Sequence, residues 1–330
     1  MFFPILIISS MMSLIMNSWF SLWMIMEINM LSIIMLMLFD KLMKYELLMK
    51  YFLFQSFNSY LYLLNSLGMF LENFTYSSLL VMNLCMLMKV SIIPFHYWYI
   101  KIINNLNWTN IFNITTINKI IPLMIISNIM NYQNINIILL NFFILLISSF
   151  ISSILGLNQT NLKMIMSYSS MIQISWIIIL LNFNEMISFN YLLIYSFISM
   201  SLYYIFNKLN LINLTQLNYI KVFNKFMLMY YLMLMFSMGA IPPSFGFLMK
   251  WINLEMMMDY KISFFFMTMM IMNSLISVYF YFRIMLISLM IYYPINKMNF
   301  KMVNNFNYMN YKLLMLNWLN FTMIIMYEII

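Results

Sequence analysis

Long apolar runs, separated by short polar connections, make up most of this 330-residue chain. A helix that crosses a membrane needs about 20 mainly apolar residues, and about eleven runs approach that length. No strict alternation of polar and apolar positions occurs, which favours helices over the strands of a β-barrel. The expected spans are residues 3–20, 22–39, 50–71, 76–95, 110–130, 134–155, 164–182, 186–207, 226–249, 262–286 and 311–330, and the longest polar connections are 40–49, 96–109, 208–225 and 287–310.

The composition excludes an ordinary soluble domain. Hydrophobic residues make up 65% of the chain and charged residues 7%, whereas a soluble domain carries about 25% charged residues. The single Cys85 rules out an intrachain disulfide, and with the single His96 it argues against a haem, zinc or iron–sulfur site. The first residues lack a basic region before their apolar run, so we expect a retained first helix. The predicted fold is an all-α polytopic membrane protein.

Small residues are scarce in this chain. Gly occurs four times and Pro six times, and Ala240 is the only alanine. Membrane helices normally use small residues where they pack closely. A strongly A/T-rich gene, typical of an organelle genome, accounts for this bias. The few Gly, Ala and Pro residues are therefore expected where the backbone requires them.

The positions of the lysines indicate how the chain is oriented in the membrane. With eleven spans, nearly all connection lysines fall on the side that also holds the N-terminus, and positive residues favour the cytoplasm-like side. This places the N-terminus on the matrix side of a mitochondrial membrane and the C-terminus opposite. A nucleic-acid surface is disfavoured because the lysines form no cluster. These lysines are Lys41, Lys44, Lys50, Lys101, Lys163, Lys208, Lys221, Lys225, Lys297, Lys301 and Lys312.

Four ionisable residues lie inside expected spans: Glu27, Lys89, Lys119 and Lys250. Each costs about 3 kcal/mol at the membrane centre, and such residues usually face a bundle interior or a wet cavity and mark proton or ion paths. Because burial disfavours the charged form, these groups can exchange protons near neutral pH. The pattern predicts a proton relay.

Prolines accompany the lysines. Lys89 precedes Pro94, and Lys250 follows Pro242–Pro243, which stand among the rare small residues. Helices interrupted beside ion sites are typical of transporters with inverted repeats. The spacing predicts repeats over 1–130 and 134–286, Lys89 and Lys250 in corresponding places, and a loop and last helix over 287–330.

Simpler interpretations remain for each residue. Lys250 is also compatible with an interfacial position, where lysines reach the headgroups. Lys119 is also compatible with solvating backbone carbonyls beside Pro122. Glu27 is also compatible with a structural role as the partner of a lysine.

The sequence resembles the subunit 2 family of mitochondrial NADH:ubiquinone oxidoreductase, respiratory complex I, over nearly its whole length. The resemblance implies an antiporter-like membrane-arm fold of two inverted five-helix repeats with broken helices, plus a C-terminal helix. The motifs that carry it are NSWFSLWMIMEINMLS (17–32), KYFLFQ (50–55), LMKVSIIPFHYW (87–98), NKIIPLMIIS (118–127), GLNQTNLKMIMSYSSMIQISW (156–176) and GAIPPSFGFLMKW (239–251).

The resemblance assigns a role to each buried charge. Glu27 matches the family's intramembrane glutamate and Lys89 the lysine thought to pair with it. Lys119 matches the central lysine, and Lys250 the distal lysine on the second broken helix. The chain departs from the family at Ile117–Asn118, where Trp-Gln is usual, and at Gln173 and Ser175.

The family implies proton translocation coupled to electron transfer from NADH to ubiquinone, in the mitochondrial inner membrane. NADH, FMN, iron–sulfur clusters and ubiquinone would be bound by other subunits, with no cofactor in this chain. Neighbouring antiporter-like and small membrane-arm subunits and the lipid bilayer, with cardiolipin as one candidate lipid, are the expected partners. A stand-alone cation/proton antiporter, active without partners, and a purely structural subunit, which pumps without the four charges, remain alternatives.

Overall fold

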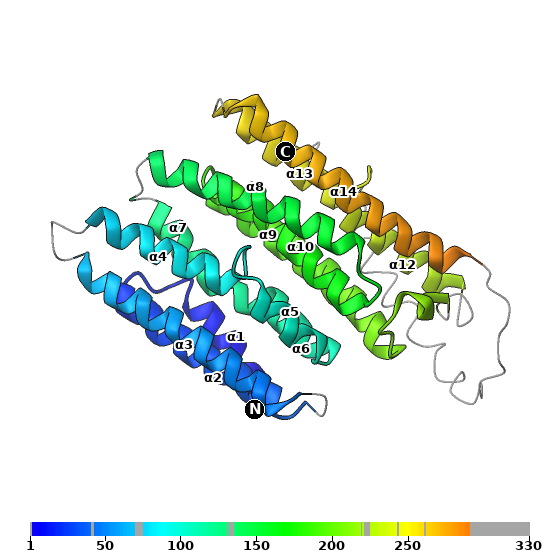
Figure 1. Ribbon diagram of the computed structural model, residues 1–330, viewed down its shortest axis with the longest axis horizontal. Helices are drawn as coiled ribbons and strands as arrows, with labels where there is room; N and C mark the ends of the chain where they lie inside the picture. Colours follow the sequence, from blue (N-terminus) through cyan, green and yellow to red (C-terminus); the bar gives the residue numbers. More distant parts are fainter. Residues whose placement is uncertain are drawn as a thin grey trace. The chain divides into compact units, whose positions relative to one another are not determined.

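Helices account for the regular structure of the residues described here (Figure 1). The computed structural model describes residues 2–290, apart from 41–42, 70–74, 131, 133–134, 219, 221–224, 243 and 261. The helices are α1 Phe2–Met12, α2 Trp19–Leu38, α3 Tyr45–Gly68, α4 Thr75–Val90, α5 Tyr97–Asn104, α6 Trp108–Phe112, η2 Asn113–Ile117, α7 Asn118–Met130, α8 Ile135–Leu157, α9 Leu162–Leu181, α10 Glu185–Lys208, η3 Leu214–Leu217, α12 Lys225–Gly239, α13 Phe245–Asp259 and α14 Phe264–Leu289.

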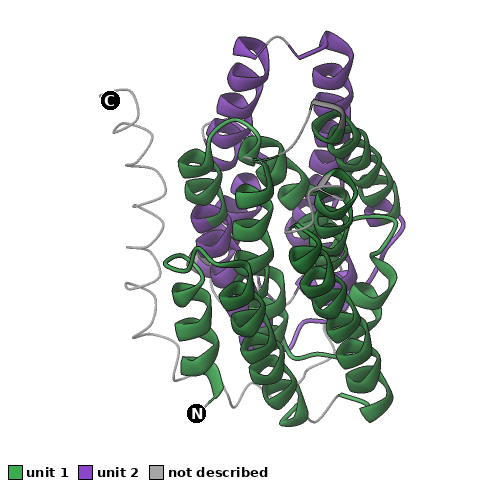
Figure 2. Ribbon diagram, turned by 90° about the vertical axis from the view of Figure 1, so that its left-hand side faces the viewer, with its two compact units in different colours: residues 1–155, 166–192 green, residues 156–165, 193–330 purple. Residues whose placement is uncertain are grey.

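The chain divides into two compact units, coloured separately in Figure 2. The first comprises residues 1–155 and 166–192, and the second 156–165 and 193–330. In the first unit α2 packs against α1, α3 and α7, while α4 packs against α3 and α7. In the second unit α12 packs against α13 and α14. The helices of the first unit therefore place three of the four candidate residues on neighbouring elements.

Six helices in the described residues are long and apolar enough to cross a membrane: α2, 108–130, 137–157, α9, α10 and α14. Shorter apolar helices cover 2–12, 76–90 and 227–239. The polytopic all-α prediction is confirmed, whereas the number of eleven spans is not, and the expected span 311–330 lies outside the described residues. Helix α9 is the most enclosed of the six, with 94% of an 18-residue stretch buried against 39% for α14.

The prediction of a polar connection over residues 96–109 is wrong, because helix α5 occupies most of this stretch. Tyr99, Ile100, Ile102 and Ile103 of α5 are buried. These residues recur at helical spacing between exposed polar ones, and this short amphipathic pattern was masked by Lys101 and the asparagines that follow. The chain thus continues as a helix after the proline at position 94.

Helix α4 ends at Val90, and Ser91 follows it, three residues before Pro94. Ser91 adopts a left-handed backbone with φ 71°. The N–H of Ile92 donates to the carbonyl of Leu87, and that of Ser91 to the carbonyl of Met88, both at 3.1 Å. This is the hydrogen-bond pattern with which helices usually end at a glycine. The Ser91 hydroxyl donates to the Val90 carbonyl, which the proline would leave without a helical partner.

Helix α12 ends at Gly239 in the same way, and Ala240, which follows it, has φ 55°. The N–H of Ile241 donates to the Phe236 carbonyl at 3.2 Å, and that of Ala240 to the Ser237 carbonyl at 3.3 Å. Both expected spans, 76–95 and 226–249, are therefore interrupted helices, as predicted from their prolines.

The two buried lysines do not occupy corresponding places in these broken helices, so that prediction is wrong. Lys89 lies in the last turn of α4, before its break, whereas Lys250 lies in α13, after its break. Counted from the left-handed residue, Lys101 has the position equivalent to Lys250. The sequence places each lysine near a proline, but it does not show whether the lysine lies in the helix before the break or in the helix after it. The repeats over 1–130 and 134–286 stay a prediction.

Serines act as the small residues of α8 and α9. Each donates its hydroxyl to the carbonyl three residues earlier, so burial leaves no hydroxyl donor unsatisfied. With few Gly and Ala available, serine is the small residue that allows close packing. These serines are Ser148, Ser149, Ser152, Ser153, Ser169, Ser170 and Ser175.

Arg283, the only arginine, secures the connection between α8 and α9 from α14. Its guanidinium donates to the carbonyl of Leu157 and, at 2.8 Å, to that of Gln159. Hydrogen bonds to a charged group contribute about 1.5–3 kcal/mol each. Two carbonyls of this connection therefore depend on one side chain.

We expect Arg283→Met to lower the heat resistance of the second unit, because both carbonyls lose a charged donor. The measurement is the temperature at which half of the assembled protein is lost on native gels. Lys208→Met, which also removes one positive charge, is the control. Equal temperatures for the two variants would contradict the assignment.

Candidate functional site

The packing of α2, α4 and α7 gathers three of the predicted site residues in the first unit. Glu27 comes from the middle of α2, Lys89 from the end of α4, and Lys119 from the start of α7. Helix α7 contacts both other helices. Lys89 and Lys119 lie 62 and 92 positions after Glu27 in the sequence, and the packing of α7 against both α2 and α4 brings the three helices together.

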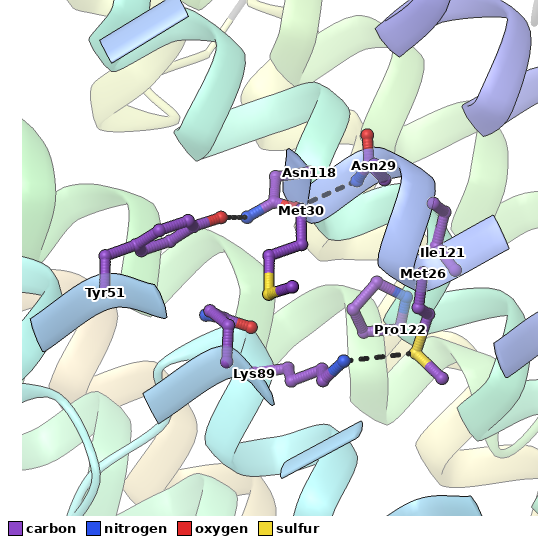
Figure 3. A pocket seen from close by; sticks show the side chains of 9 residues that line it. Met26, Asn29, Met30, Tyr51, Lys89, Asn118, Ile121 and Pro122 are labelled. Carbon is purple, nitrogen blue, oxygen red and sulfur yellow. Dashed lines mark hydrogen bonds between the residues drawn. The ribbon is translucent and has the colours of Figure 1, made fainter. Parts of the chain in front are cut away.

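Lys89 is 7% exposed, and its amine donates to the Met26 sulfur at 3.4 Å (Figure 3). Glu27 follows Met26 directly but is half-buried and accepts a hydrogen bond from the Ser59 hydroxyl of α3. Within the described residues one ion pair occurs, between Lys50 and Glu46, so Glu27 and Lys89 form none. The carboxylate and the amine thus bond to separate neutral partners, the Ser59 hydroxyl of α3 and the Met26 sulfur of α2.

A small cavity adjoins Lys89, with room for roughly one water molecule. Its polar lining includes Asn29, Tyr51, Gln55 and Asn118. Asn29 donates to Asn118 at 3.0 Å, and Asn118 donates to the Tyr51 hydroxyl at 3.3 Å (Figure 3). The side-chain nitrogen of Gln55, which is 4% exposed, has no partner among the described residues. The cavity is therefore polar on one side, and the side-chain nitrogen of Gln55 can donate a hydrogen bond to a water molecule inside it.

Lys119 is 2% exposed and lies against two hydroxyls. Its amine donates to the Tyr99 hydroxyl at 3.4 Å and to the Ser170 hydroxyl at 3.5 Å, and these two oxygens are 2.5 Å apart. The amine also lies 4.6 Å from the centre of the Tyr99 ring, a cation–π distance. Both hydrogen-bond partners of this amine are therefore neutral groups.

Lys250 belongs to the second unit, where it is 7% exposed on α13. It lies one helical turn after Gly246, the residue at which α13 approaches α12. Lys163, counted above among the connection lysines, is 4% exposed because α9 begins at Leu162. Proton transfer from Lys119 in the first unit to Lys250 in the second unit stays a prediction.

The sequence reasoning missed the neutral partners of the lysines. Asn29, Gln55 and Asn118 lie inside the motifs quoted above, but nothing in a single sequence shows that they share one cavity. Tyr99 and Ser170 are separated from Lys119 by 20 and 51 positions. A polar residue on the buried face of an apolar helix is the one signal that points to them.

A family model described as "NADH:quinone oxidoreductase/Mrp antiporter, TM" matches residues 16–277. A protein of Anopheles gambiae named NADH-ubiquinone oxidoreductase chain 2 is 32% identical over 93% of this chain and 89% of its own length. The protein of that name from Aedes aegypti is 33% identical over 95% of this chain and 92% of its own length.

Solved structures share the fold at low sequence identity. A chain of the membrane-bound sulfane sulfur reductase, an archaeal respiratory membrane complex, matches with a TM-score of 0.84 at 14% identity, over 99% of this chain and 72% of that one. A chain of respiratory complex I from Thermus thermophilus matches with a TM-score of 0.72 at 16% identity, over 81% and 64%. A chain of the Mrp complex from Dietzia matches with a TM-score of 0.72 at 11% identity, over 85% and 58%.

Proposed function

The chain belongs to the NADH:quinone oxidoreductase/Mrp antiporter transmembrane family, and we propose that its four buried ionisable residues form a proton relay. It is a membrane-arm subunit of respiratory complex I that takes part in proton translocation. The observation that supports the relay is the state of Lys89 and Lys119. Both amines are buried in the first unit, and their partners are the neutral groups of Met26, Tyr99 and Ser170.

The relay works through the charge of Glu27. When the carboxylate approaches Lys89, it stabilises the ammonium form in a medium of low dielectric constant. When it withdraws to Ser59, the amine releases its proton towards Lys119. The proton then continues to Lys250 and to the next antiporter-like subunit or the opposite face. Redox energy from the rest of the complex drives the movement of Glu27, and no electrons pass through this chain.

The electron-transfer cofactors belong to other subunits in this proposal. NADH, FMN, iron–sulfur clusters and ubiquinone are needed by the whole complex. One cysteine cannot supply the four thiolates that a cluster usually takes, so this chain's donor set does not fit one. The neighbouring membrane-arm subunits and the lipids of the mitochondrial inner membrane, cardiolipin among them, are the partners.

The proposed orientation places the N-terminus in the matrix and the C-terminus in the intermembrane space. It rests on the side that collects the connection lysines. Lys44 and Lys101 belong to this side and lie in the described residues. In this orientation the end of the first unit where α2 ends and α3 begins faces the matrix.

Glu27→Gln tests the relay, because it keeps the size of the side chain and its bond to Ser59 but removes the charge. We expect coupled turnover of the assembled complex to fall about tenfold, as one pKa unit of lost cation stabilisation corresponds to 1.36 kcal/mol. The measurement is NADH:ubiquinone turnover together with proton uptake in vesicles. Glu46→Gln, at the exposed pair with Lys50, is the matched control. The same turnover in both variants would refute the switch.

A further inference from the structure

Asp40, just after the end of α2, accepts hydrogen bonds from three donors at the start of α6. The backbone N–H of Asn107 donates to it at 3.3 Å and the side chain of Asn110 at 2.6 Å, and the side chain of Asn107 donates as well. An aspartate that only caps a helix needs backbone donors. Here two side-chain amides also point to the carboxylate.

The amides continue into the unit. Asn113 donates to the side-chain oxygen of Asn110 at 3.5 Å. Burial increases along this line, since Asp40 is half-buried, Asn110 is 9% exposed and Asn113 is 6% exposed. Asn107, Asn110 and Asn113 recur every three residues, so they lie along one side of the helix.

The π-helical segment η2 extends the line to the Lys89 cavity. The N–H of Asn118 donates to the carbonyl of Asn113, five residues earlier. In this pattern residues five apart lie on successive turns, whereas an α-helix would turn Asn118 to another side. Asn118 then bonds to Asn29 and Tyr51 and lines the cavity with Lys89. The irregular segment thus turns Asn118 closer to the side of the helix that carries Asn113 than an α-helix would.

We propose that Asp40 and the asparagines at 107, 110, 113 and 118, the asparagine file, form the proton-uptake path of the first unit. Asp40 accepts a proton from the aqueous phase on a carboxylate oxygen. The proton passes along waters ordered by the amides and binds the neutral amine of Lys89, so no other bond changes and no electron moves. The unpartnered nitrogen of Gln55 in the cavity marks the place of the last water. The path rests on the proposed function, because it supplies the relay.

Three variants of Asp40 and Asn113 separate proton uptake from helix capping. Asn caps a helix as well as Asp does, so Asp40→Asn removes the proton-binding group but keeps one oxygen that can accept from the Asn107 N–H and the Asn110 amide. Its NH2 group cannot accept the bond from the Asn107 side chain, so this one bond is lost. Asp40→Glu keeps a carboxyl group, but the longer side chain caps a helix poorly. We expect coupled turnover to fall about tenfold or more in Asp40→Asn and to recover in Asp40→Glu. Asn113→Leu should show the same fall, because it interrupts the line in its middle.

The experiment uses the assembled complex in vesicles and measures proton uptake per NADH together with turnover, normalised to the amount of complex. Asn105→Leu is the control, since Asn105 donates to the Lys101 carbonyl, outside the asparagine file. Normal turnover in Asp40→Asn together with a defect in Asp40→Glu would show that Asp40 only caps the helix, and it would rule out the proton-uptake path. If Glu27→Gln is impaired while Asp40→Asn and Asn113→Leu are normal, the path fails and the relay stands. If Glu27→Gln is normal as well, the relay itself fails.

Discussion

Replacing Lys89 by methionine is expected to slow coupled NADH:ubiquinone turnover of the assembled complex by roughly 100-fold, the lower end of what one positioned proton-transfer group contributes. Methionine fills a similar volume without an amine, so the cavity beside Asn118 and Gln55 stays lined. The proton from the uptake path then has no acceptor between the cavity and Lys119.

Lys101→Met is the matched control for this prediction, because Lys101 belongs to the same broken helix. Lys101 is exposed, and its amine lies over the ring of Tyr97 at 4.2 Å. Turnover and the ratio of protons to electrons are measured for both variants in vesicles. An unchanged ratio together with unchanged turnover in Lys89→Met would remove Lys89 from the mechanism.

Adding one methyl group at Gly246 is expected to destabilise the second unit by about 3 kcal/mol, the upper end for overpacking, and to reduce the amount of assembled complex. A Cβ atom there would lie 2.0 Å from the Ser237 carbonyl oxygen and 3.4 Å from the Ala240 Cα atom. Both neighbours are backbone atoms at the end of α12. Neither can rotate away as a side chain would.

Gly68→Ala provides the comparison, since a Cβ atom at that position meets only the Ser78 side chain at 3.7 Å, an ordinary contact. We expect Gly68→Ala to assemble normally. Native gels of membranes that carry each variant give the amount of complex. Normal assembly of Gly246→Ala would show that α13 can move away from α12 at little cost.

The sequence predicted the broken helices but not where they break. Pro94 indicated the first interruption, yet α4 already ends at Val90, because Ser91 after it adopts the backbone that glycine usually supplies. In a chain with four glycines, helix ends lose their usual marker. Ala240 ends α12 in the same way.

The buried charges could be predicted because each is costly in an apolar span. Their partners could not be predicted, because they depend on how helices pack. Tyr99 reaches Lys119 only because the chain continues as α5 after the break, in a stretch expected to be a loop. The asparagines of the uptake path needed the π segment, which has no marker in the sequence.

The enclosure of α9 has a consequence for biosynthesis. This helix is apolar enough to cross a membrane, although 94% of its central stretch is buried within the folded chain. A newly made helix meets lipid before its neighbours surround it, and every backbone polar group must then be satisfied within the segment. Ser169, Ser170 and Ser175 each bond to their own helix, so they suit both environments. The serine hydroxyls of α9 thus keep a hydrogen-bond partner in both surroundings, in lipid during insertion and within the folded protein after assembly.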